Sequence, residues 1–76
     1  MDLKRRFGLA LKRERELARI SQEEVAMRIG ADQAYVSRIE AGQINLTLET
    51  VEAIAAALNV DPSALLAKPS DAARRQ

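Results

Sequence analysis

The sequence predicts an all-α fold on two observations, and its composition limits the chemistry of the chain. Apolar residues recur at spacings of three and four along most of the 76-residue chain, the period of an amphipathic helix. Capping residues and glycines divide this pattern into short segments. Cysteine and histidine are both absent, which excludes disulfides, thiolate metal sites and histidine-based catalysis. We expect five helices in one domain over residues 1–68, followed by a short disordered tail over residues 69–76.

The first helix is expected from Leu3 to about Ala18. Its inward side comprises Leu3, Phe7, Ala10, Leu11 and Ala18, and its outward side carries Lys4, Arg5, Lys12 and Arg13. A basic amphipathic helix can also lie on a membrane surface. The stripe lacks interfacial aromatic residues and is needed to cover the other helices, so packing within the protein is favoured.

Residues 21–42 predict two short helices joined by a tight turn. Ser21 begins a capping box, in which its side chain accepts from the amide of Glu24 and the Glu24 carboxylate returns to the amide of Ser21. Gly30 suits the left-handed conformation that ends a helix, and Asp32 can cap the next helix. The inward residues are Val25, Ala26 and Ile29 in the first helix and Val36 and Ile39 in the second. This arrangement predicts a helix-turn-helix whose second helix covers about residues 33–40.

The outward face of the second helix carries Gln33, Ala34, Ser37 and Arg38. An amide can pair with adenine through two hydrogen bonds and a guanidinium with guanine, while small side chains allow close approach to thymine methyls. On an isolated helix a merely solvated polar face would be the preferred interpretation. The capping box, the glycine and the second cap at such short spacing favour insertion into the major groove of DNA.

Two further helices are expected. Thr47 is a suitable N-cap for a helix that ends at Ala57 or Leu58, and Asn59 can take the left-handed position after it. Its inward stripe is Leu48, Val51, Ile54, Ala55 and Leu58, and Val60 packs back. Asp61-Pro62 begins the last helix, over about residues 62–67. Leu65 and Leu66 are adjacent and cannot both face one core, so one of them could lie in a two-fold interface or be exposed alone.

The net charge of +1 conceals an uneven distribution. Residues 1–38 carry a net +3, residues 39–67 a net −4 and residues 68–76 a net +2. Helices 1 to 3 therefore form the basic side that phosphate binding requires. The N-terminus has no apolar signal segment, and no run is long enough to span a bilayer, so a cytoplasmic protein with no membrane partner is expected.

Together these segments resemble the phage-repressor and Cro type, or Xre family, of bacterial helix-turn-helix regulators. The resemblance covers about residues 7–66 and rests on Arg15, SQEEVA at 21–26, Gly30, YVSRIEAG at 35–42 and TLETVEAIAAALNV at 47–60. It implies a compact five-helix lambda-repressor-like domain that binds double-stranded operator DNA as a homodimer. No enzymatic activity, cofactor or small-molecule ligand is implied, and the length is compatible with restriction–modification controller proteins.

By position, the resemblance implies roles for individual residues. Gln33, Ala34, Ser37 and Arg38 match base-reading sites. Gln22 and Tyr35 match positions near the sugar-phosphate backbone, although the Tyr35 ring is equally well placed to pack over the turn. Apart from the resemblance, we expect phosphate contacts from the loop residues Gln43 and Asn45 and from Lys12 on the basic side of the first helix. Arg15 and Glu40 match a structural ion pair, and Leu65 and Leu66 are placed in the dimer interface.

The sequence also departs from the family pattern. Glu14 stands where an apolar residue is frequent, so we expect either a slightly rotated first helix or a gap covered by Leu17. Arg19 replaces a frequent glycine. Ala41 and Gln43 replace polar or basic residues, which leaves the amides of residues 43–45 to position the phosphate. Two other functions stay open: a protein-binding adaptor of the same fold, and an antitoxin-type component that binds DNA and a toxin.

Overall fold

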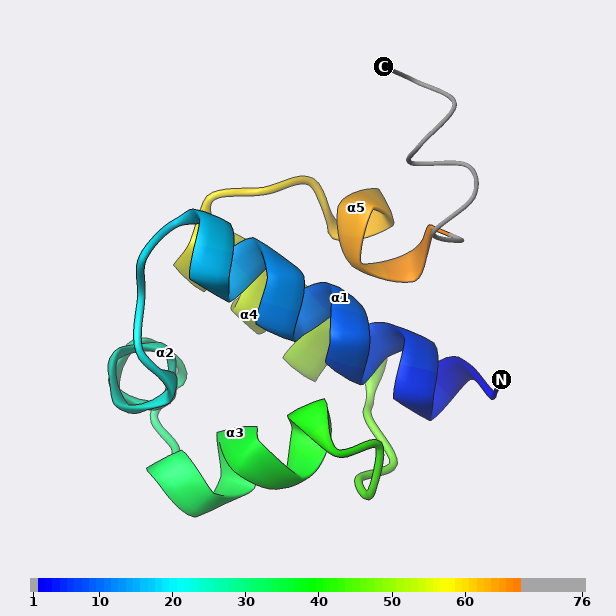
Figure 1. Cartoon of the computed structure of the whole chain (residues 1–76), viewed down its shortest axis with the longest axis horizontal. Coiled ribbons are helices and arrows are strands. Elements are labelled where there is room, and N and C mark those ends of the chain that lie inside the picture. The colour runs from blue at the N-terminus through cyan, green and yellow to red at the C-terminus, as the bar shows by residue number, and fades with distance from the viewer. Residues whose placement is uncertain (1, 68–76) are drawn as a thin grey trace.

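The computed structural model describes residues 2–67 and contains, within that range, five helices and no strand (Figure 1). The helices are α1 (Leu3–Leu17), α2 (Gln22–Ile29), α3 (Gln33–Glu40), α4 (Leu48–Leu58) and α5 (Pro62–Leu66). The predicted all-α fold and all five elements are confirmed, with α1 and α5 ending one residue earlier than expected. The tail predicted at 69–76 lies outside the described residues.

The helices form a closed ring of contacts around one core. α1 packs against α5 and α3, α3 against α2, α2 against α4, and α4 against α5. In Figure 1, α1 crosses the middle of the molecule, with α3 below it and α5 above it. The largest fully buried side chains are those of Phe7, Leu11, Val25, Val36, Ile39, Ile54 and Leu65. Every helix contributes to this core, so the position of α3 depends on the other four.

The helix ends follow the predicted capping residues. Ser21, Asp32 and Thr47 each accept a hydrogen bond from the backbone N–H three residues on. Gly30 and Asn59 take the expected left-handed conformation, with φ of 73° and 57°. The capping box is only half formed, because Glu24 pairs with Arg28 at 3.0 Å instead of returning to Ser21. A charged donor one helical turn away is a stronger partner than a neutral amide.

Asp61 caps α5 by accepting from the backbone N–H of Ser63 at 2.9 Å. This bond, together with the Ser63 hydroxyl, lowers the pKa of the Asp61 carboxyl. A carboxylate whose pKa is lower in the folded state stabilises the fold above its unfolded pKa, and this contribution is lost as the pH falls through the folded pKa. The cap is therefore fully effective at neutral pH.

Three residues predicted to face inward are exposed: Leu3, Ala18 and Leu48. Each lies at or just beyond a helix end, where the helical period still points inward but no neighbouring helix covers the side chain. Leu17 is also exposed. Glu14 is accommodated by an ion pair with Arg13 at 3.4 Å.

Four arginine side chains donate to backbone carbonyls at or near helix ends. Arg6 donates to the carbonyl of Leu66 at 2.7 Å and Arg13 to that of Ala64 at 3.4 Å, so two α1 side chains hold α5. Arg28 donates to Ala57 in the last turn of α4, and Arg15 donates to Ile20 in the turn after α1. Carbonyls at helix ends lack partners within their own helix, and these donors satisfy them. No helix within residues 2–67 is long and apolar enough to cross a membrane.

Candidate DNA interface

The outer face of α3 is polar and accessible. Gln33, Ala34 and Arg38 are exposed, and Ser37 is partly buried. The opposite face is anchored in the core by Val36 and Ile39, both essentially inaccessible to solvent. The helix therefore presents the predicted amide and guanidinium outward while its inner side holds it in place.

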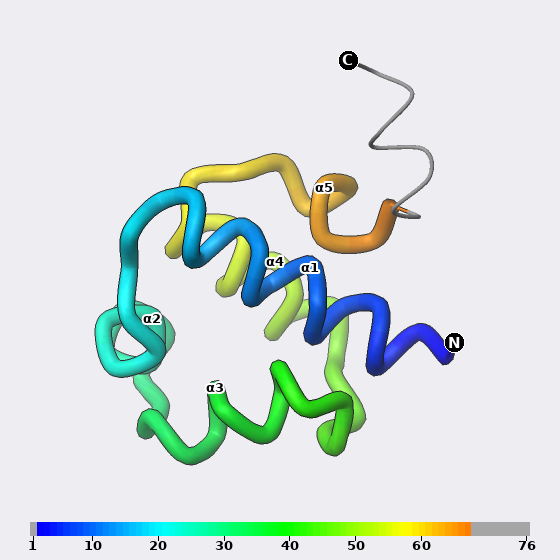
Figure 2. Tube along the Cα trace, in the orientation of Figure 1, coloured from blue at the N-terminus to red at the C-terminus, as the bar shows by residue number. Residues whose placement is uncertain are grey.

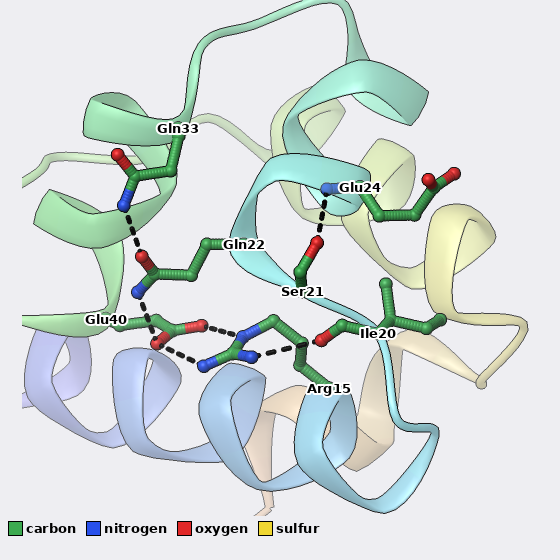
Figure 3. Close-up of polar contacts among 7 residues, drawn as sticks. All are labelled: Arg15, Ile20, Ser21, Gln22, Glu24, Gln33 and Glu40. Carbon is green, nitrogen blue, oxygen red and sulfur yellow. Dashed lines mark hydrogen bonds and ion pairs between the residues drawn. The ribbon is translucent and has the colours of Figure 1, made fainter.

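Arg15 and Glu40 form the expected ion pair, which joins α1 to the last residue of α3 (Figure 3). The guanidinium donates twice, from Nε to Oε2 at 2.7 Å and from Nη2 to Oε1 at 3.1 Å. Only 13% of the Arg15 side chain and 6% of the Glu40 side chain are exposed. The hydrogen bond to Glu40 raises the pKa of Arg15 further above its ordinary value, so this residue is always charged. The pair fixes α3 against α1.

A chain of side-chain amides extends this pair to the start of α3. Gln22 donates from Nε2 to Oε1 of Glu40 at 3.0 Å, and Gln33 donates from Nε2 to Oε1 of Gln22 at 2.6 Å (Figure 3). Gln22, predicted as a phosphate contact, is thus also the residue that orients Gln33. The carbonyl oxygen of the Gln33 amide remains turned away from this chain, available as an acceptor. The sequence did not predict this chain of hydrogen bonds, because its members lie on three separate helices: Arg15 on α1, Gln22 on α2, and Glu40 and Gln33 on α3.

The other predicted phosphate contacts are spread around α3. Lys12, Gln43 and Asn45 are exposed, Lys12 on α1 and the other two in the loop after α3. The backbone N–H of Gln43 already donates to the carbonyl of Arg38 at 3.0 Å, so only its side-chain amide is free to position phosphate. The ring of Tyr35 packs against the core and remains partly exposed. Their contacts with phosphate stay predictions.

The predicted interface role of Leu65 is wrong, because its side chain is fully buried in the core of its own chain. Leu66 is only partly buried and lines an apolar groove between the start of α1, the loop before α4 and the end of α5. The exposed side chains of Leu3 and Leu48 line the same groove. The helical period alone placed these two leucines in the core, so this surface was missed.

A five-helix domain whose α2–α3 pair exposes a polar second helix defines a class, the helix-turn-helix DNA-binding regulators. Comparison with protein families agrees: the helix-turn-helix family model matches residues 11–65, and the chain belongs to this family. The chain is a DNA-binding transcription regulator of Xre type.

The chain is also similar to several individual proteins. The chain is 43% identical over 65 residues to the control protein C.MunI from Mycoplasma sp, covering 84% of this chain and 88% of that protein. A hypothetical transcription factor from Neisseria, NHTF, superposes with a TM-score of 0.92 at 33% identity, over 99% of this chain and 86% of the other. The restriction–modification controller C.Esp1396I, solved as a tetramer on its natural 35-base-pair operator, gives a TM-score of 0.77 at 28% identity, over 86% of each chain.

Proposed function

We propose that the protein regulates transcription as a homodimer that reads a two-fold symmetric operator, with α3 in the major groove of each half-site. The observation that carries this proposal is the exposed outer face of α3, whose first residue, Gln33, is oriented by the bonded chain from Arg15 through Glu40 and Gln22. In a two-fold dimer two such helices enter successive major grooves about 34 Å apart. The operator complex of C.Esp1396I supports DNA binding by this fold.

The proposed contacts fall into two groups. Gln33, Ala34, Ser37 and Arg38 read bases, because they lie along the outward side of α3. Gln22, Tyr35, Gln43, Asn45 and Lys12 contact the sugar-phosphate backbone and set the register of the dimer. Base contacts determine sequence preference, whereas phosphate contacts strengthen binding to every duplex.

The experiment that tests the proposal is selection of bound duplexes from a random DNA pool at about 0.15 M salt, since affinity depends strongly on salt. Enrichment of an inverted repeat with half-sites about one helical turn apart is the expected result. Binding to every duplex without enrichment would contradict sequence reading and favour an adaptor, or a domain that needs a second protein.

Arg38→Ala is expected to weaken binding to the selected operator by about 1–3 kcal/mol and to relax the preference at one base pair in each half-site. The reason is the loss of a guanidinium that can donate two hydrogen bonds to guanine. The measurement is titration of wild-type and variant protein with the operator and with a shuffled duplex. Lys12→Gln is the comparison, since loss of a phosphate contact weakens both duplexes alike. If Arg38→Ala lost the same affinity for both duplexes, the proposal that Arg38 contacts a base would be wrong.

We place the dimer interface at the apolar groove lined by Leu3, Leu48 and Leu66. Leu48 is 76% exposed and Leu3 is 56% exposed, so both leave apolar surface in water that a second chain would bury. Leu48→Glu should therefore raise the dimer dissociation constant at least about tenfold, because burying a leucine contributes about 1.5–3 kcal/mol. Analytical ultracentrifugation measures this constant. Leu17→Glu, an equally exposed leucine outside the groove, should leave it unchanged; an equal effect of both would place the interface elsewhere.

We also propose that the regulated genes encode a restriction–modification system. The similarity to C.MunI and C.Esp1396I, named as control and controller proteins, supports this assignment. The test is to locate the selected operator in the source genome: a site upstream of a methyltransferase or endonuclease gene supports the proposal, and sites only elsewhere contradict it.

A further inference from the structure

The cations of α1 and the turn after it fall into two sets. Arg6, Arg13 and Arg15 are engaged inside the molecule, by carbonyls of α5 or by Glu40. Lys4, Arg5, Lys12 and Arg19 are exposed, and their side chains have no hydrogen-bond or ion-pair partner among residues 2–67. The second set is free to neutralise charges on another molecule.

Three of these free cations, Arg5, Lys12 and Arg19, are spaced seven residues apart. Seven residues are nearly two helical turns, so Arg5 and Lys12 lie on one face of α1 about 10 Å apart. Arg19 lies two residues past the end of α1, in the turn that leads to α2. We call Arg5, Lys12 and Arg19 the cationic row. Its helical part, from Arg5 to Lys12, spans about 10 Å, roughly a third of one turn of duplex DNA.

The cationic row borders the helix-turn-helix. Gly8 and Arg15, three residues after Arg5 and Lys12, contact the end of α3 through its backbone and through Glu40. At one end of the row the side chain of Arg5 lies against Gly42 in the turn after α3, where an added Cβ would be 2.7 Å from its Cγ. At the other end Arg19 immediately precedes Ile20 and the start of α2. Figure 2 shows α1 running past α3 towards the loop that leads into α2.

We propose that the cationic row contacts the phosphate backbone beside the groove that α3 enters, and supplies most of the sequence-independent affinity. This inference rests on the proposed function. The row consists of three neighbouring cations that the protein itself does not neutralise, whereas residues 39–67 contain no Lys or Arg and four acidic residues. Binding through such contacts releases condensed counterions, so the row would dominate the salt dependence of affinity.

A substitution at Arg19 can separate the effect of its charge on DNA binding from any effect on folding. Its φ of 59° lies in the left-handed region, which glycine adopts without steric cost. Arg19→Gly therefore removes a charge and relieves the backbone at once. We expect a melting temperature that is unchanged or higher, together with weaker binding to every duplex. Loss of affinity in this variant cannot then be attributed to unfolding.

The test compares wild type with a variant combining Arg5→Gln, Lys12→Gln and Arg19→Gly, on a random-sequence duplex and on the selected operator, at several salt concentrations. Six charges per dimer are removed, so the slope of log affinity against log salt should fall by about 5, and affinity at about 0.15 M salt by at least about tenfold on both duplexes. Glu16, exposed on the same side of α1, repels phosphate; Glu16→Gln should strengthen binding to both duplexes.

Lys4→Gln is the matched control, because Lys4 is also an exposed cation of α1 but lies beside the apolar groove, outside the row. It should leave the salt slope unchanged, whereas each cation of the row contributes about 0.9 to the slope. An unchanged slope in the triple variant, or an equal change per charge in Lys4→Gln, would contradict the proposal that the cationic row supplies most of the sequence-independent affinity. Either result leaves the proposed function intact if Arg38→Ala still weakens the operator selectively, whereas no binding by wild type would contradict the proposed function itself.

Discussion

Glu40→Ala is expected to lower the free energy of unfolding by about 3–5 kcal/mol. The substitution leaves Arg15, whose side chain is 13% exposed, without its carboxylate partner. An unpaired charge in a largely buried position retains its desolvation cost and loses the attraction that compensated it. In a domain of this size the melting temperature should fall by more than about 10 °C, as measured by thermal unfolding followed by circular dichroism.

The control for this prediction removes both charges together. A double variant, Arg15→Met with Glu40→Leu, leaves no buried charge, so it should recover most of the lost stability, since apolar replacement of a buried pair is often neutral. An unchanged melting temperature in Glu40→Ala would refute the structural role of the pair. A double variant as unstable as the single one would show that packing, and not the unpaired charge, causes the loss.

The double variant also tests what the pair does for DNA binding. It removes the carboxylate that accepts from Gln22, and Gln22 in turn accepts from Gln33. Without Glu40, Gln22 is no longer held and no longer fixes Gln33, so the folded double variant should lose more affinity for its operator than for random duplex. Stability and sequence reading therefore depend on the same carboxylate for different reasons.

Features set by neighbouring residues in the chain could be predicted from the sequence. The caps at Ser21, Asp32 and Thr47 and the left-handed positions at Gly30 and Asn59 depend only on backbone geometry within a few residues. The face of α3 followed from the helical period, because its buried positions repeat regularly. The Arg15–Glu40 pair came from the family resemblance, since 25 residues separate its members.

Features set by where a helix ends relative to its neighbours could not be predicted. The helical period placed Leu3 and Leu48 inward, but neither is covered by another helix. Leu65 was placed in a dimer interface, but its side chain is buried in the core. The Glu24 carboxylate pairs with Arg28 instead of accepting from the backbone N–H of Ser21. The Gln22 side chain links Glu40 to Gln33 through two hydrogen bonds. Each outcome depends on which helices meet in space.

Gly8 shows this most clearly, because in the sequence it is only a glycine inside a helix. Helical propensity alone predicts that Gly8→Ala stabilises the protein by roughly 0.5–1 kcal/mol. The structure predicts the opposite sign. Gly8 is buried where α1 crosses the end of α3, and a Cβ there would lie 2.7 Å from the carbonyl oxygen of Glu40 and would also overlap that of Ile39. Both obstacles are backbone atoms, so no side-chain rotation removes the overlap.

Gly8→Ala should therefore destabilise the fold by about 2 kcal/mol or more, the usual cost of overpacking. Because α1 and α3 must separate, the ion pair between Arg15 and Glu40 should lengthen, and operator affinity should fall even at temperatures where the variant is folded. Gly30→Ala is the control: no atom lies within 4 Å of its added Cβ, so only the left-handed backbone, at φ 73°, opposes it, at about 1–2 kcal/mol. Urea unfolding and operator titration of both variants distinguish the two causes. A Gly8→Ala protein as stable as wild type would mean that α1 and α3 have room to move apart, and that the close approach does not hold the recognition helix.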